Sequence, residues 1–159
     1  MSPRRTIREK QSENKELRQL LLKLYEVKHI RLLWQGELSS DLRNALFRTA
    51  GTDSFIAKRR YEREVVNLLR EEDDEGLSFL RALIDDEGHY LQQEEEILSQ
   101  YRSRLQQPAE FTDFIANYPQ VSVQQFRQFL RRYAQNNDRK AKQKLDSVLI
   151  SLLFPTAWV

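Results

Sequence analysis

Apolar residues recur at intervals of three and four positions along most of this chain, and that spacing limits its possible folds more than any other feature. In the segment from Ala57 to Arg70, Val65, Leu68 and Leu69 have the i, i+3, i+4 spacing of one buried helical stripe. Only four glycines and four prolines are present in 159 residues, which is too few for the many turns of an all-β fold. The sequence therefore predicts an all-α protein.

Capping and helix-breaking residues divide the apolar pattern into eight expected helices. Gly36 interrupts the pattern after the first helix, and Ser39 or Ser40 is suited to cap the second. Pro108 suits the first turn of the sixth helix, and Pro119 stops it because the residue before a proline resists the α conformation. The expected helices span residues 6–33, 41–49, 55–71, 75–84, 87–106, 109–117, 123–134 and 139–153.

These helices fall into two groups. The first five would form an N-terminal lobe over residues 1–106, with a long first helix and a basic third helix. The last three are short and rich in aromatic residues, and they would form a C-terminal lobe over residues 107–159. The first turns of the chain, residues 8–16, carry almost no apolar side chains, so we expect them to project from the core or to stay disordered until they meet a partner. The predicted architecture is two small helical lobes.

Composition excludes several classes of protein and site. The chain has no cysteine, so neither a disulfide nor a zinc site with thiolate ligands can form. No apolar segment follows the charged N-terminus, so we expect no secretory signal. Apolar runs such as Leu20-Leu21-Leu22 are far too short to cross a bilayer. We expect a cytoplasmic protein that is monomeric and has no membrane partner.

The net charge of +2 conceals a strong segregation of charge along the chain. Residues 71–96 carry eleven acids and a single base, Arg81, whereas residues 1–35 carry nine bases and four acids. Residues 127–146 are again basic, with seven bases and two acids. Segregation of this kind indicates one surface that binds polyanions and another that is acidic.

Residue patterns for catalysis or metal binding are weak in this sequence. Asp86, Glu87 and His89 include a carboxylate and a histidine at a spacing that can share a metal ion on a helix. A di-iron bundle needs that motif twice, and acids are expected at a helix start in any case. The sequence offers neither a nucleophile paired with a base nor a glycine-rich phosphate loop. We expect no enzymatic activity, no metal and no cofactor.

Two basic helical segments are candidate RNA-binding surfaces. Residues 57–70 combine the apolar stripe with five cations, and Arg127 and Arg131 lie four positions apart, so they share one helix face. Arginine and lysine on rigid helices suit the phosphates and 2′-hydroxyls of RNA. For both segments the alternative is a solvated helix face with salt bridges, and the residues alone leave both interpretations open.

Several separated motifs have the order and spacing of one known family over about Thr6 to Leu153. They are Leu38-Ser39-Ser40-Asp41-Leu42-Arg43, Lys58-Arg59-Arg60, Leu68-Leu69-Arg70, Tyr118-Pro119, Gln124-Gln125-Phe126-Arg127-Gln128-Phe129-Leu130-Arg131 and Arg139-Lys140-Ala141-Lys142-Gln143-Lys144. This series resembles the YjgA-like family of bacterial ribosome-associated proteins, also called dual-action ribosomal maturation proteins. Tyr61 stands where the family has glutamine, and Val66-Asn67 where it has Gly-Lys, so the chain resembles a divergent member.

The resemblance implies an all-helical, non-enzymatic protein that binds late precursors of the large (50S) ribosomal subunit. It implies that the partner is 23S rRNA, whose peptidyl transferase centre the protein helps to mature, with large-subunit ribosomal proteins as further candidates. We expect RNA contacts from three basic regions. The basic arm contains Arg4, Arg5 and Arg8; the central patch contains Lys58, Arg59, Arg60 and Arg63, with Arg70 further along the same helix; the C-terminal patch contains Arg127, Arg131, Lys140, Lys142 and Lys144.

A protein–protein adaptor is the alternative function. Its contact surfaces would be the acidic middle segment and the apolar stripe of the first helix. Neutralising Glu71, Glu72, Asp73 and Asp74 would then abolish the partner interaction without weakening any affinity for RNA.

Overall fold

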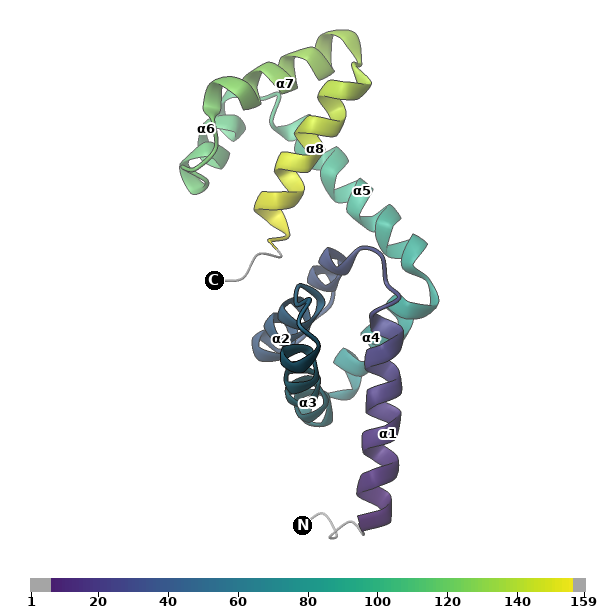
Figure 1. Ribbon diagram of the computed structural model, residues 1–159. Helices are drawn as coiled ribbons and strands as arrows, with labels where there is room; N and C mark the ends of the chain where they lie inside the picture. Colours follow the sequence, from purple (N-terminus) through teal and green to yellow (C-terminus); the bar gives the residue numbers. More distant parts are fainter. Residues whose placement is uncertain (1–6, 156–159) are drawn as a thin grey trace. The chain divides into compact units, whose positions relative to one another are not determined.

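The computed structural model describes residues 7–155, and every regular element in that range is a helix, which confirms the all-α prediction (Figure 1). In chain order the elements are α1 (Ile7–Leu24), η1 (Ile30–Gln35, a 3₁₀ helix), α2 (Ser40–Ala50), α3 (Phe55–Glu71), α4 (Asp74–Asp85), α5 (Glu87–Arg104), α6 (Pro108–Asn117), α7 (Val123–Asn136) and α8 (Arg139–Leu153). No helix in this range is both long enough and apolar enough to span a bilayer.

The described chain divides into two compact units within α5. We call residues 7–90 the N-terminal unit and residues 91–155 the C-terminal unit. The lobe boundary expected from the sequence, after Gln106, stays a prediction.

In the N-terminal unit, α3 packs against both α1 and α2, and α1 also contacts α4 (Figure 1). The apolar stripe of α3 supplies Val65 and Leu69, which are fully buried, while Leu68 is only partly covered. Leu21 and Leu24 of α1 complete the contact from the facing helix. Packing of these stripes fixes which face of α3 is left for solvent, and that is the face that carries most of its cations.

The first helix is shorter than predicted, since α1 ends at Leu24 and not near Leu33. Its last turn tightens, with the amide of Glu26 donating to the carbonyl of Lys23 and that of Val27 to Leu24. The following segment is held from elsewhere in the unit, because the amide of His29 donates to Glu87 Oε1 at 2.9 Å. No glycine or proline marks this break, so tertiary contacts decide it.

Gly36 marks a place where two segments approach closely. A Cβ at this position would lie 2.1 Å from the ring of Phe79, a distance that no side chain can occupy. Phe79 in turn packs edge-on against Tyr90, with ring centroids 5.4 Å apart. Glycine at this position therefore lets the backbone after η1 approach the Phe79 ring of α4 closely.

Side-chain caps explain why other helix boundaries agree with prediction. Ser54 Oγ accepts from the amide of Ala57 at 3.5 Å and begins α3 at the predicted residue. Asp138 Oδ1 accepts from the amides of Lys140 and Ala141 at 2.9 and 3.4 Å and begins α8 as predicted. The remaining helices begin and end within two residues of their expected limits.

Aromatic rings form much of the core of the C-terminal unit. Phe126 of α7 stacks on Phe111 and Phe114 of α6, with centroids 5.8 Å apart in each pair. Phe129 and Leu130 of α7 are also buried. The core residues are Leu98, Leu105, Phe111, Phe114, Phe126, Phe129, Leu130, Leu145 and Leu149. The opposite face of α7 is left to carry Arg127 and Arg131.

Candidate nucleic-acid interface

A polar groove runs between α1 and α3 in the N-terminal unit, and we call it the α1–α3 groove. It has a volume of about 280 Å³. Its lining residues are Asn14, Arg18, Arg59, Glu62, Arg63, Val66, Asn67 and Arg70. Four arginines and one acid give this groove a net positive charge, which suits an anionic ligand.

Helical spacing brings the cations of α3 to this groove. Arg59 and Arg63 lie four positions apart and Arg70 lies two turns further on, so the three share one face of the helix. Arg70 donates to Asn67 Oδ1 at 3.3 Å and also to Asn14 Oδ1 across the groove. Within residues 7–155, neither Arg59 nor Arg63 forms an ion pair, so their charges are available to a ligand.

The structure distributes the central patch over more than one face of α3. Lys58 turns away from the groove, and its Nζ lies 4.6 Å from the centroid of the Tyr25 ring. The guanidinium of Arg60 lies 5.3 Å from the centroid of the Tyr61 ring. Of the four cations expected in this patch, only Arg59 and Arg63 line the α1–α3 groove.

The single acid of the groove is tied to a tyrosine. Tyr25 Oη donates to Glu62 Oε1 at 3.1 Å. Burial raises the pKa of Tyr25 well above its ordinary value, and the negative charge of Glu62 raises it further. The phenol therefore stays neutral at physiological pH and remains a hydrogen-bond donor to Glu62. This hydrogen bond occupies one carboxylate oxygen of Glu62.

Arg127 and Arg131 of the C-terminal patch line a second groove, between α6 and α7. This groove has a volume of about 470 Å³, and its floor includes Phe111 and Leu130. The guanidinium of Arg127 lies 5.1 Å from the centroid of the Phe111 ring, a cation–π arrangement. Both arginines are exposed, so both can reach a phosphate.

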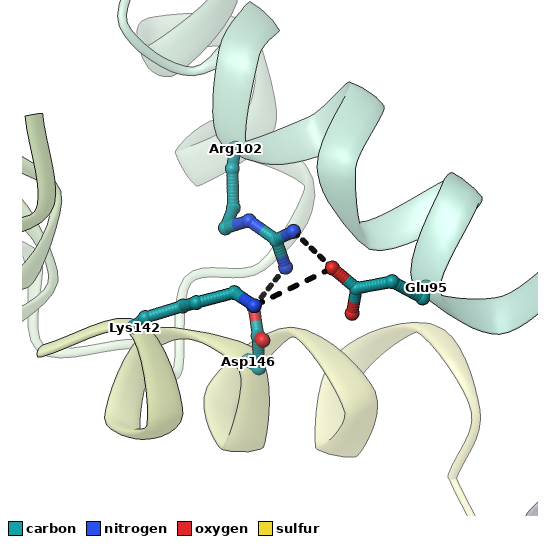
Figure 2. Close-up of polar contacts among 4 residues, drawn as sticks. All are labelled: Glu95, Arg102, Lys142 and Asp146. Carbon is teal, nitrogen blue, oxygen red and sulfur yellow. Dashed lines mark hydrogen bonds and ion pairs between the residues drawn. The ribbon is translucent and has the colours of Figure 1, made fainter. Parts of the chain in front are cut away.

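Lys142 belongs to a different environment from the rest of the C-terminal patch. Its Nζ lies 3.5 Å from Glu95 Oε1, in a network that joins α5 to α8 (Figure 2). Arg102, only 3% exposed, donates to Glu95 Oε1 at 2.5 Å and to Asp146 Oδ1 at 2.6 Å. Lys140 and Lys144 lie outside this network and are exposed. We call Glu95, Arg102, Lys142 and Asp146 the α5–α8 ion network.

The two carboxyls of the α5–α8 ion network respond to burial in opposite ways. Burial alone would raise the pKa of Glu95, but the hydrogen bond and charge of Arg102, helped by Lys142, outweigh it and lower the pKa. Asp146 has the same arginine as a partner, yet burial dominates and raises its pKa. The difference follows from exposure, because half of the Glu95 side chain reaches solvent and only 17% of Asp146 does.

The basic arm is only partly described. Arg8 lies in the first turn of α1 and is exposed, whereas Arg4 and Arg5 lie outside the described residues. Buried residues of α1 begin at Leu17, so the preceding turns carry no core side chain, in agreement with the expectation that they project.

Several acids of the middle segment make local contacts within the fold. Glu72 Oε2 accepts from Ser39 Oγ at 3.0 Å, and Asp73 Oδ1 accepts from the amide of Gly76 at 2.8 Å. Glu87 supports the segment before η1 through His29. No cluster of three or more potential metal ligands occurs between residues 7 and 155.

Sequence reasoning did not single out three polar residues that line the α1–α3 groove: Asn14, Arg18 and Asn67. It also did not single out Arg102 as a buried ion-pair partner. The α1 stripe at Leu17, Leu20 and Leu21 placed Asn14 and Arg18 near one edge of the buried face. The missing information was which helix packs against that edge.

Comparison with known proteins identifies the family of this chain. The family model described as "Dual-action ribosomal maturation protein DarP" matches residues 4–153, a range that includes all nine helices found within the described residues 7–155. No curated protein matches the sequence. A match over nearly the whole chain shows the family, and the family is one of ribosomal maturation. The chain belongs to the family of the dual-action ribosomal maturation protein DarP.

Proposed function

We propose that this protein assists assembly of the large ribosomal subunit by binding 23S rRNA in late precursor particles and promoting maturation of the peptidyl transferase centre. The observation that carries the RNA-binding part is the α1–α3 groove, where arginines from two helices converge and Arg59 and Arg63 have no ion-pair partner among residues 7–155. The large-subunit target and the maturation step rest on membership of the family.

The chemistry of the groove suits the RNA backbone more than base edges. Guanidinium groups bind phosphate oxygens through charged, bidentate hydrogen bonds. Proteins recognise folded RNA mainly through phosphates, 2′-hydroxyls and shape, which needs rigidly placed cations and no sequence-reading side chains. The buried stripe of α3 holds Arg59 and Arg63 in place without using their charges.

The C-terminal unit supplies a second, separate contact in this proposal. Arg127 and Arg131 lie on the outer face of α7, and Lys140 and Lys144 share a face of α8 because they are four positions apart. Two contact surfaces on one chain raise the overall affinity, since the second binding event becomes intramolecular. We propose a monomer that acts in the cytoplasm without catalysis, metal or cofactor, with large-subunit ribosomal proteins as further partners.

Sedimentation of cell lysate tests the proposal. At low salt the protein should travel with precursors of the large subunit, and raising the salt should release it because phosphate contacts weaken steeply. The Arg59→Ala/Arg63→Ala double variant should shift toward the top of the gradient. Its salt dependence of RNA affinity should flatten by about 1.4–1.8 units of log–log slope, two contacts' worth.

Arg60→Ala is the matched comparison: Arg60 lies on the same helix but outside the groove, so its loss should flatten the salt dependence less than the loss of Arg59 or Arg63 does. A wild-type protein that stays at the top of the gradient at low salt contradicts the proposal. The adaptor function is correct instead if the wild-type protein binds no nucleic acid but binds a protein partner, and if neutralising Glu71, Glu72, Asp73 and Asp74 abolishes that interaction.

A further inference from the structure

The first two residues of α3 expose large apolar side chains to solvent. Phe55 is 73% exposed and Ile56 is 82% exposed. Ser54 caps the helix and fixes its first turn, so the position of these residues is set by the fold. Neither side chain contributes to the core of the N-terminal unit.

Phe55 lies at the end of the cationic face that lines the α1–α3 groove. Phe55, Arg59 and Arg63 are spaced four apart and therefore follow one line along α3. The guanidinium of Arg59 lies 5.6 Å from the centroid of the Phe55 ring, so Arg59 connects the ring to the groove. Most of the ring surface remains open to solvent.

We propose that Phe55 stacks on an unpaired nucleobase whose adjoining phosphates lie along Arg59 and Arg63 in the α1–α3 groove. This inference rests on the proposed function and specifies its ligand: a single-stranded or looped RNA segment. Sites for single-stranded nucleic acid combine an aromatic platform with a cationic path for the backbone, and this line of residues has both parts.

Charge complementarity favours RNA over a protein at this site. An apolar peptide would have to approach through Lys58, Arg59 and Arg60, which follow Phe55 within one and a half turns. The same cations attract an RNA strand. A continuous duplex cannot use Phe55, because its bases are stacked on one another and present no free face.

Binding of the full chain to two RNAs tests the inference. The probes are a fluorescently labelled oligouridine and a closed RNA hairpin of similar length, measured at equal salt. Wild type should bind both, and Phe55→Ala should lower affinity for oligouridine by about 5- to 150-fold. The variant should leave hairpin affinity and the salt slope unchanged, because it removes no charge. Phe55→Trp should retain or increase oligouridine affinity.

Ile56→Ala is the matched control, since it removes an equally exposed apolar side chain that has no aromatic face. Both truncations should leave the melting temperature near that of wild type, because neither residue is buried. Equal losses for the two variants, or none for Phe55→Ala, overturn the inference. So does a Phe55→Ala protein that keeps oligouridine but loses precursor particles, since Phe55 then contacts a protein.

Failure of the proposed function would look different. In that case wild type binds neither the oligouridine nor the hairpin at low salt, and no variant changes this. A third outcome is that Arg59→Ala/Arg63→Ala weakens binding of both the hairpin and the oligouridine, whereas Phe55→Ala changes neither. This outcome supports the proposed function and rejects the stacking site.

Discussion

The basic helix α3 and the basic helix α8 look alike in sequence, but the fold uses their cations differently. On α3, Arg59 and Arg63 face an open groove and form no ion pair within residues 7–155. On α8, Lys142 enters the α5–α8 ion network beside the buried Arg102 (Figure 2). A cation without an ion-pair partner is available to a ligand, whereas a paired one such as Lys142, whose side chain is still 39% exposed, contributes to the fold. Density of charge along a helix therefore does not identify a binding surface by itself.

The largest effect that tests this comparison is on stability. Arg102→Ala should destabilise the protein by about 3 kcal/mol, because it removes a buried arginine and leaves Asp146, only 17% exposed, without this partner. Chemical denaturation followed by circular dichroism measures this loss. Arg104→Ala is the control: its ion pair with Glu110 is exposed, so the change should stay within about 0.5 kcal/mol. Similar losses for the two variants would mean that burial of Arg102 has no energetic consequence.

A smaller effect separates two lysines of α8. Lys144→Ala should flatten the salt dependence of RNA affinity by about 0.7–0.9 units, since it removes one exposed cation. Lys142→Ala should change that slope less and should instead lower stability by up to about 1 kcal/mol, because Lys142 pairs with the half-exposed Glu95. Filter binding at several salt concentrations, with a denaturation curve for each variant, checks both. If Lys142→Ala flattens the slope more than Lys144→Ala does and leaves stability unchanged, Lys142 contacts RNA.

The smallest expected effect concerns pH. The pKa of Glu95 is lowered in the folded protein, so its ionised form stabilises the fold above its ordinary pKa of about 4.3, and this contribution is lost as pH falls through the lowered value. Glu95→Gln should therefore lose less stability than wild type between about pH 5 and pH 3. Asp146, with its raised pKa, is present in both proteins and acts in the opposite direction.

Urea midpoints at pH 7, 5 and 3 provide the measurement for Glu95→Gln. The difference between variant and wild type should be largest at pH 7 and shrink at pH 3. It should be smaller than the effect of Arg102→Ala, because half of the Glu95 side chain is exposed and solvent screens its charge. Parallel pH curves for the two proteins would show that Glu95 carries no net electrostatic stabilisation.

The sequence by itself determined the fold class, most helix boundaries and the buried stripe of α3. These features depend on local energies: helical spacing fixes a face, and a capping side chain such as Ser54 or Asp138 fixes a helix start within three residues. Helical spacing likewise puts Phe126, Phe129 and Leu130 on the buried face of α7 and Arg127 on its exposed face. The family resemblance was also readable in the sequence, because its motifs lie in order along the chain.

Only the tertiary structure decided where α1 ends and which cations are free. The segment that follows the break at Leu24 is held by Glu87, which accepts from the amide of His29, and by the carbonyl of Tyr90, which accepts from Gln35 Nε2. Both acceptors lie more than fifty residues away from their donors in the chain, so no local signal near Leu24 encodes these contacts. Arg18 and Arg59 line one groove because α1 and α3 pack together. Arg102 forms an ion pair with Asp146 because α5 and α8 pack together. Periodicity fixes the face of a single helix, but it does not specify which other helix will cover that face.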